Sequence, residues 1–146
     1  MHKITLENIL LKDRFRKGTS FFLYSAFEFS LSIPLALKLT KTKSQLPSPL
    51  LEKEQAMLKA LDSVDGVPKL YLSTRVHFGF FTDLLGKNLQ EISEETKAFS
   101  IENVKKVAVE ILGVLKGVHG KGIIHRNITP ENILFLGLRK SGISYF

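Results

Sequence analysis

The chain has 146 residues, of which 44% are hydrophobic and 24% charged, a composition that favours one folded domain and argues against wholesale disorder. It contains no cysteine, which excludes disulfide bonds and thiolate metal sites in this sequence. Lysine and arginine exceed aspartate and glutamate by 21 to 14, and we interpret the net charge of +7 as a solvated basic exterior, because no aromatic-rich basic motif indicates a specific nucleic-acid partner.

The first part of the chain is expected to form β-strands. Residues 1–7 lack the apolar core and cleavage site of a signal peptide, so we expect an intracellular protein of the cytoplasm or nucleus. Residues 20–37 carry one charge, Glu28, and superficially resemble a membrane span. From Phe27 to Leu39, however, apolar residues alternate with residues that are polar or small apart from one proline. This period of two predicts sheet strands within residues 5–40 and no membrane span.

A helix is predicted after a polar loop. It runs from about Pro49 to Leu61, with Ser48 as a plausible N-cap. Glu54 falls in the middle of its apolar face, where an unpaired carboxylate carries a desolvation cost of several kcal/mol. The candidate cation is Lys38, which ends the preceding apolar run. The apolar face itself consists of Leu50, Met57, Leu58 and Leu61.

Shorter elements follow this helix. The sequence D-G-V-P at residues 65–68 predicts a turn. Strand-like segments follow over residues 69–73 and 76–84, and residues 86–99 suit a loop and a short helix.

The longest predicted helix begins near Ser100 and ends at Gly120 or Gly122. Its apolar residues recur at i, i+3, i+4 and i+7, which is typical of an amphipathic helix. Two short strands are expected at residues 133–136 and 142–146. The apolar stripe of the helix is Ile101, Val104, Ala108, Ile111, Leu112, Leu115 and Val118.

The run from His125 to Asn132 carries the functional signal. It reads H-R-N-I-T-P-E-N and resembles the catalytic loop of protein kinases, H-R-D-x-K-P-E-N. The catalytic Asp is replaced by Asn127, whose amide cannot accept a proton near neutral pH. The Lys is replaced by Thr129, which cannot place positive charge on a transferring phosphoryl group. The motif therefore indicates the family and argues against its activity.

Three further segments strengthen the resemblance. The run L-A-L-K at residues 35–38 is similar to the V-A-I-K strand, whose Lys pairs with a Glu on the next helix. Lys38 and Glu54 have that order. The segments G-V-P-K-L-Y at residues 66–71 and L-L-G-K-N-L at residues 84–89 resemble G-V-P-K-V-Y and the hinge L-L-G-P-S-L of the casein kinase I group.

The resemblance covers the whole chain and implies a fold. That fold is α+β and protein kinase-like, with an antiparallel sheet and one αC-type helix in an N-lobe over about residues 1–84. A hinge follows at about residues 82–86. Residues 87–146 would begin a mainly helical C-lobe that is partial here and ends near the catalytic loop.

The resemblance also implies a nucleotide site. Lys38 would contact the α- and β-phosphates of ATP, and Asn132 would bind magnesium if a nucleotide is present. Four scattered histidines show no ligand spacing, so we expect no structural metal held by protein side chains. The adenine would contact Ala36, the gatekeeper Thr82, the backbone of Asp83 and Leu85, and Leu134 as the floor of the pocket.

Several departures from the family fall on the phosphate side of this site. The glycines of the phosphate-covering loop G-x-G-x-x-G correspond to Arg16, Gly18 and Phe21, so only Gly18 is kept as a phosphate-contact position. Phe21 could fill or cap the cleft, together with its neighbour Phe22. The chain ends at Phe146, before a D-F-G segment, which predicts inactivity even for Asn127→Asp.

We therefore expect a casein kinase I-like pseudokinase that acts through binding. One alternative is the N-terminal portion of a serine/threonine kinase whose other half supplies D-F-G and the activation segment. A second alternative is an interaction module without a nucleotide site. In each case the helix at residues 100–119 would lack part of its packing partner, which predicts self-association or a protein partner.

Overall fold

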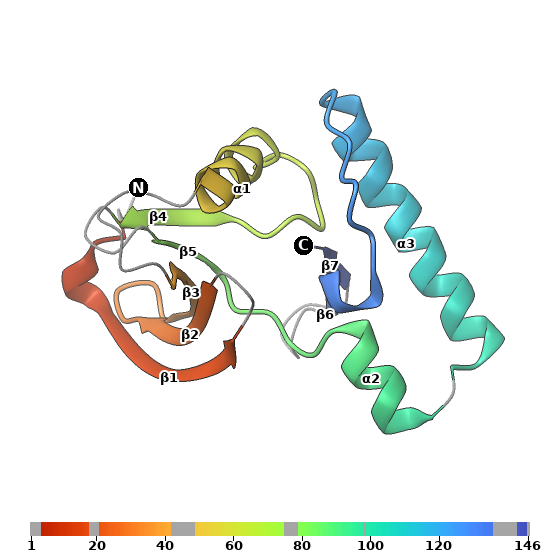
Figure 1. The fold of residues 1–146 in the computed structure, drawn as a ribbon, viewed down its shortest axis with the longest axis horizontal. Coiled ribbons are helices and arrows are strands. Elements are labelled where there is room, and N and C mark those ends of the chain that lie inside the picture. Colours follow the sequence, from red (N-terminus) through yellow and green to blue (C-terminus); the bar gives the residue numbers. More distant parts are fainter. Residues whose placement is uncertain are drawn as a thin grey trace. The chain divides into compact units, whose positions relative to one another are not determined.

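The computed structural model describes residues 4–17, 21–41, 49–74, 79–97, 99–135 and 143–145 (Figure 1). The chain divides into two compact units. The first consists of Met1–Lys59 and Lys69–Leu84, and the second of Ala60–Pro68 and Leu85–Phe146. A sheet dominates the first unit and helices dominate the second, so the predicted α+β class is confirmed.

The first unit contains a five-stranded antiparallel sheet. Its strands follow the order β1-β2-β3-β5-β4, so that β1 and β4 are the edges. The β-rich N-terminal region and the two later strand-like segments are thereby confirmed. The strands are β1 (Ile9–Lys17), β2 (Phe21–Glu28), β3 (Ile33–Thr40), β4 (Leu70–Thr74) and β5 (Gly79–Asp83), and a short 3-10 turn at Leu6–Asn8 precedes β1.

One face of this sheet forms the core of the first unit. Its buried members are Ala26, Leu35, Leu37 and Phe81. Ala26 pairs with Leu35 and Leu37 pairs with Phe81, and paired residues lie on the same face of a sheet. The half-buried apolar residues packed against them are Ile9, Tyr24, Ile33, Leu39, Tyr71 and Leu72.

A turn between β2 and β3 interrupts the alternation predicted from Phe27 to Leu39. Glu28 was expected on the less buried face but is fully buried, whereas the apolar Phe29 is 59% exposed. The Glu28 carboxylate accepts hydrogen bonds from the Ser30 hydroxyl (2.5 Å) and the Leu31 backbone N–H (2.7 Å). Hydrogen bonds within the turn therefore override the period-two pattern at these positions.

The predicted helix after the polar loop is α1 (Pro49–Ala60). Its proposed N-cap, Ser48, lies outside the described residues. The predicted apolar face is wrong at Leu50, which is 67% exposed, while Leu51 is buried together with Leu58. These two leucines are seven positions apart, which places them two turns apart on one side of the helix. The buried face is thus rotated away from Leu50.

The second unit contains two helices and a two-stranded sheet. The elements are α2 (Leu89–Thr96), α3 (Ile101–Gly120), β6 (Ile133–Phe135) and β7 (Ile143–Tyr145), with a 3-10 turn at Pro130–Asn132. β6 and β7 are antiparallel. The predicted short helix, long helix and final strands are all confirmed.

Side-chain caps define where α2 and α3 begin. The Asn88 side chain accepts the Glu91 backbone N–H (2.8 Å), and the Glu91 carboxylate accepts the Asn88 backbone N–H (2.8 Å). This reciprocal pair is a capping box, which satisfies two backbone donors at the helix start. The Ser100 hydroxyl accepts the Asn103 N–H at 3.2 Å, which confirms that the long helix begins after Ser100.

The packed face of α3 differs in part from the predicted apolar stripe, because Val107 and Val114, which lie outside that stripe, pack together with Ile111. Val118 is buried, and Val107, Ile111 and Val114 pack around the buried Ile133 of β6. The remainder of the stripe is bare among the described residues. Its large exposed members are Ile101 (76%), Val104 (53%) and Leu112 (65%), and Ala108 is exposed as well. The sequence-based expectation of a partly bare stripe is confirmed.

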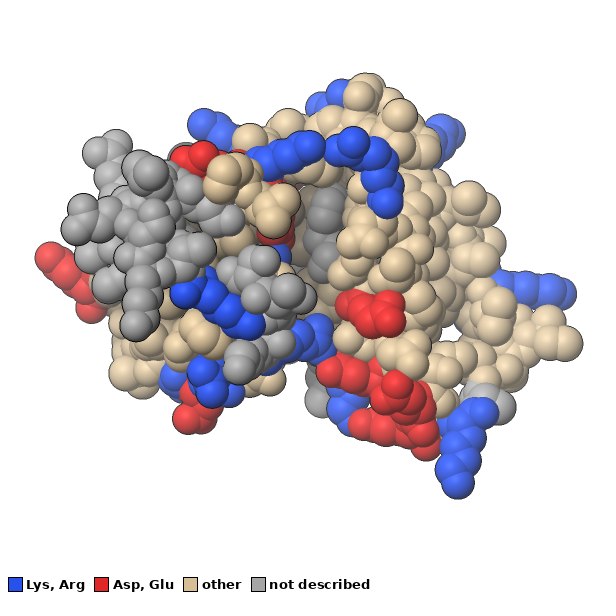
Figure 2. Space-filling model, viewed as in Figure 1, with Lys and Arg blue, Asp and Glu red and all other residues tan. Residues whose placement is uncertain are grey.

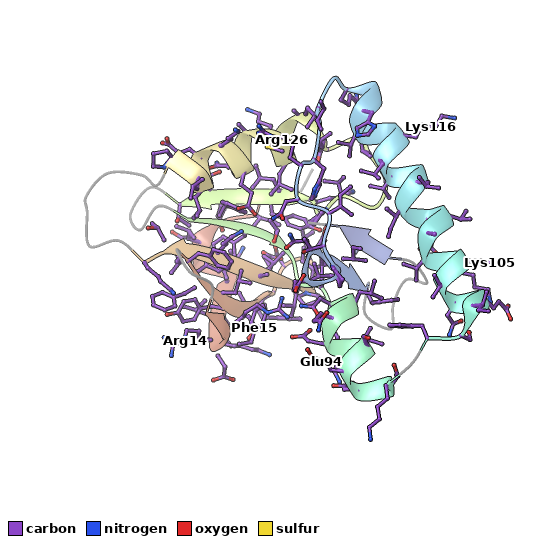
Figure 3. All side chains as sticks on the ribbon, turned by 45° about the vertical axis from the view of Figure 1, so that its right-hand side comes forward. Arg14, Phe15, Glu94, Lys105, Lys116 and Arg126 are labelled. Atoms are coloured by element: carbon purple, nitrogen blue, oxygen red, sulfur yellow. The ribbon has the colours of Figure 1, made fainter. Side chains whose placement is uncertain are left out.

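In Figure 2 most of the surface that is not grey is neither acidic nor basic, and a cluster of acidic side chains lies over α2. On α3, Lys105 and Lys116 project away from β6 and β7 (Figure 3). No helix among the described residues is long and apolar enough to cross a membrane.

Candidate functional site

The ion pair predicted between β3 and α1 is present. Lys38 Nζ donates to both carboxylate oxygens of Glu54, at 2.7 and 2.6 Å. Both side chains are partly shielded, with 16% of Lys38 and 31% of Glu54 exposed. A second contact, from the Gln55 amide to the Ser73 hydroxyl, joins α1 to β4. Glu54 therefore has the cation that its position on the helix requires.

The sheet register places three of the predicted site residues on one face. Ala36 pairs with Thr82, and Lys38 lies two residues further along the same strand. Side chains two apart on a strand share a face. Ala36 is buried and Thr82 is half-buried. Gly18, the remaining glycine of the predicted phosphate loop, lies outside the described residues.

The two neighbouring phenylalanines at the start of β2 point to opposite faces. Phe21 lies on the face of Lys38, with the Lys38 ammonium 4.1 Å from its ring centroid. Phe22 lies on the other face, where its ring is 5.1 Å from the Arg14 guanidinium and 5.3 Å from the Lys41 ammonium. Of these two rings, only Phe21 covers Lys38.

The end of β5 is fixed by side chains that the sequence analysis did not single out. The Asp83 carboxylate accepts hydrogen bonds from the Tyr71 hydroxyl (2.8 Å) and from the Lys69 backbone N–H (2.7 Å). Burial raises the pKa of Tyr71, and the hydrogen bond and charge of Asp83 raise it further. The Thr82 hydroxyl donates a long bond of 3.4 Å to the Asp83 carbonyl. Hydrogen bonds from Tyr71 on β4 and from Lys69, just before β4, therefore fix the position of Asp83.

In the second unit, the segment after Leu85 forms backbone hydrogen bonds with Phe135 at the end of β6. Gly86 N–H donates to the Phe135 carbonyl (2.8 Å), and Phe135 N–H donates to the Lys87 carbonyl (3.0 Å). A Cβ on Gly86 would lie 3.1 Å from that Phe135 oxygen, so glycine permits the close approach. Leu134 forms a bridge with Asn88. Leu85 and Leu134, both half-buried, are thus tied into one local arrangement.

The loop from His125 to Asn132 is held by its own hydrogen bonds. The Asn127 backbone N–H donates to His125 Nδ1 (3.2 Å), and Asn132 Nδ2 donates to the Asn127 carbonyl (3.1 Å). Arg126 between them adopts a left-handed φ of 64°. The exposed side chain of Asn127 is an amide, so this side chain supplies no proton acceptor near neutral pH.

Thr129 stands where the kinase motif has lysine, and it forms hydrogen bonds within its own loop. The hydrogen bond of the Thr129 side chain lowers the pKa of Glu131. Thr129 also accepts the Asn132 N–H through its backbone carbonyl, at 3.0 Å. Its hydroxyl therefore serves the loop and carries no charge that could stabilise a phosphoryl group.

A small apolar cavity of about 20 Å³ lies between α3 and the loop from His125 to Asn132. That volume holds about one water molecule, so the cavity is too small for an organic ligand. Burial lowers the pKa of His125 at its wall. The lining residues are Ile111, Val114, Leu115, Val118, His125, Ile128, Asn132 and Ile133.

The described residues offer little to a metal ion. No group of three or more histidine, aspartate or glutamate side chains within them could hold one. Asn132 uses its amide nitrogen for the bond to Asn127, and its amide oxygen is the atom suited to magnesium. This residue therefore fits as one magnesium ligand and does not form a site by itself.

Comparison with known proteins gives consistent matches. The sequence matches the protein kinase domain family over residues 17–141. It is 27% identical over 121 residues to casein kinase I homolog RAG8 of Kluyveromyces lactis and 30% identical over 105 residues to casein kinase I homolog 2 of Saccharomyces cerevisiae. These alignments cover 81% and 70% of this chain, and 22% and 19% of the relatives. Serine/threonine-protein kinase D of Synechocystis sp. is 36% identical over 97 residues, which are 65% of this chain and 19% of that protein. The chain spans about a fifth of the length of these curated relatives.

Proposed function

Because this chain belongs to the protein kinase family, we propose that it is a domain of the casein kinase I type that binds an adenine nucleotide and acts through binding, with phosphoryl transfer impaired or absent. The observation that carries this proposal is the contrast between two positions. The Lys38–Glu54 pair is fully made, whereas the position of the catalytic base is occupied by the amide of Asn127.

Nucleotide binding is supported by the surface of the first unit. Ala36 offers a small side chain on the same face of β3 as Lys38, where the resemblance places the adenine. The backbone at Asp83 ends β5 and is held by Tyr71, so its carbonyl is a fixed acceptor for an exocyclic amine. In the second unit, Leu85 and Leu134 retain the types of residue that the resemblance assigns to the adenine pocket.

The proposed loss of chemistry follows from the catalytic loop. General acid–base catalysis contributes about 10²–10⁴-fold to a reaction, and Asn127 cannot provide it. Thr129 removes a positive charge, and electrostatic stabilisation is often the largest contribution to catalysis. Asn132 would supply one magnesium ligand if a nucleotide binds.

A protein partner or self-association belongs to the same proposal. The bare stripe of α3, which is Ile101, Val104 and Leu112, exposes three large apolar side chains along one side of one helix. Scattered apolar residues are ordinary on a protein surface, but an aligned set of this kind is typical of an interaction surface.

The binding part is tested by thermal unfolding with adenosine or ATP at about 1 mM. If the dissociation constant is about 10 μM, binding stabilises the folded state by about 2.7 kcal/mol and raises the melting temperature by several degrees. Ala36→Val, which adds two methyl groups at the adenine position, should reduce the shift for both ligands. No shift with either ligand would favour the interaction module without a nucleotide site.

The catalytic part is tested by transfer of labelled γ-phosphate from ATP and magnesium to protein acceptors and to the chain itself. We expect the wild type to be indistinguishable from Lys38→Ala. Magnesium-dependent transfer by the wild type that is lost in Lys38→Ala would overturn the proposal and favour the reading of an enzymatically competent kinase portion.

A further inference from the structure

The ammonium of Lys38 is enclosed by two other side chains of the first unit. An ammonium group has three hydrogens to donate, and two of them are directed to the Glu54 carboxylate at 2.7 and 2.6 Å. The ring of Phe21 covers the same nitrogen, with its centroid 4.1 Å away. This distance is well within the range of about 6 Å in which a cation is attracted to a ring face.

The position of Phe21 follows from strand register. Leu23 pairs with Lys38, and Phe21 is two residues before Leu23 on β2. Phe21 and Lys38 are therefore diagonal neighbours on one face of the sheet, a separation that aromatic and long side chains bridge. Phe22, one residue later, cannot reach Lys38 because alternation sends it to the opposite face.

This enclosure opposes a phosphate group at Lys38. Glu54 takes two of the three ammonium hydrogens, so a phosphate oxygen that approaches the remaining one meets the ring of Phe21. The face of an aromatic ring carries partial negative charge, so it attracts the ammonium but repels an approaching anion.

We propose that the adenine site of this chain takes a nucleoside in preference to a nucleotide, and that Phe21 is the residue that determines this specificity. The inference rests on the proposed function, because it assumes that the sheet face with Ala36 and Thr82 binds adenine. It adds the class of ligand: an uncharged purine nucleoside, bound without help from Lys38.

The decisive measurement is calorimetric titration of the 146-residue chain with adenosine and with ATP, both without magnesium. We expect the wild type to bind adenosine at least as tightly as ATP. Phe21→Ala should tighten ATP binding relative to adenosine by about 2- to 30-fold, which is the range that corresponds to loss of one cation–π contact. Phe22→Ala is the matched control, since its ring lies on the other face, and it should behave as the wild type.

A wild-type preference for ATP, or a ratio of ATP to adenosine affinity that is unchanged in Phe21→Ala, would overturn the inference and leave the proposed function standing. Absence of binding by either ligand to every variant would overturn both. The two results are distinguishable. If only the inference fails, adenosine still binds and Ala36→Val weakens that binding; if the proposed function fails as well, adenosine does not bind.

A second measurement needs no ligand and keeps the inference testable if a variant binds poorly. Acylation of Lys38 by an amine-reactive ester is followed by peptide mass spectrometry, with the exposed Lys105 on α3 as internal reference. Removal of the ring in Phe21→Ala should raise the relative rate at Lys38 at least about twofold, whereas Phe22→Ala should not. Equal rates in wild type and Phe21→Ala would overturn the enclosure, provided that circular dichroism shows both folded.

Discussion

The hydroxyl of Tyr71 on β4 donates a 2.8 Å hydrogen bond to the Asp83 carboxylate at the end of β5. The same carboxylate accepts the Lys69 backbone N–H at 2.7 Å. Burial, followed by the hydrogen bond and charge of Asp83, raises the pKa of Tyr71. Side chains therefore join the two strands at the point where the backbone is proposed to meet the adenine.

We expect Tyr71→Phe to lower the free energy of unfolding by about 1.5–3 kcal/mol near neutral pH, because it removes a hydrogen bond to a charged acceptor. The folded protein retains the Tyr71 proton to higher pH than the unfolded chain, in which the pKa is about 10. This contribution is thus complete below about pH 10 and is lost as the pH rises through the folded pKa. Urea unfolding between neutral and alkaline pH should show a steeper loss for the wild type than for Tyr71→Phe. Tyr24→Phe is the control, and parallel alkaline curves for wild type and Tyr71→Phe would contradict the prediction.

Restoring the carboxylate of the catalytic loop should not restore activity. We expect Asn127→Asp to transfer no more labelled phosphate than Lys38→Ala, because Thr129 still lacks a positive charge and Phe21 still covers Lys38. The assay measures γ-phosphate incorporation with saturating ATP and magnesium. A rate for Asn127→Asp about tenfold above the Lys38→Ala background would show that the missing base is the main defect.

The cap of α2 should be a measurable source of stability. Asn88→Ala removes the acceptor of the Glu91 N–H and should lower the free energy of unfolding by about 1 kcal/mol. Asn88→Ser retains a capping oxygen and should stay within a few tenths of a kcal/mol of the wild type. Glu94→Ala, an exposed change on the same helix, controls for composition. Chemical denaturation separates these outcomes, and equal losses for alanine and serine would contradict a capping role.

The bare stripe of α3 should cause self-association. Leu112→Lys and Val104→Lys each place a charge in the stripe. In size-exclusion chromatography with light scattering, each variant should contain a larger fraction of monomer than the wild type. Val109→Lys is the matched control, because Val109 is 70% exposed on α3 but lies outside the stripe. A wild type that elutes as a clean, cooperatively unfolding monomer would contradict this prediction.

Patterns that are local in the chain were sufficient to predict most elements. The helix that became α3 was identified from apolar spacing and from Ser100, and the structure begins it at Ile101. The Lys38–Glu54 pair could be predicted because a carboxylate on an apolar helix face needs a nearby cation. The order of the motifs, ending in the loop with Asn127 and Thr129, indicated the family that the comparisons support.

Features that depend on contacts between distant segments could not be predicted in this way. Periodicity placed Ile111 in the apolar stripe of α3 but missed Val107 and Val114, since which residues pack depends on where Ile133 of β6 lies. The burial of Glu28 depends on a turn that its own carboxylate closes. The Tyr71–Asp83 bond joins residues twelve positions apart, and neither residue type alone signals it.

The amino-acid sequence by itself determined the family, the order of the elements and the chemical identity of Asn127 and Thr129, because these are carried by residue types and short spacings. Only the tertiary structure decided that Phe21, and not Phe22, lies over Lys38. The physical reason is the register between β2 and β3, which assigns each side chain to one face of the sheet and is fixed by the packing of the core.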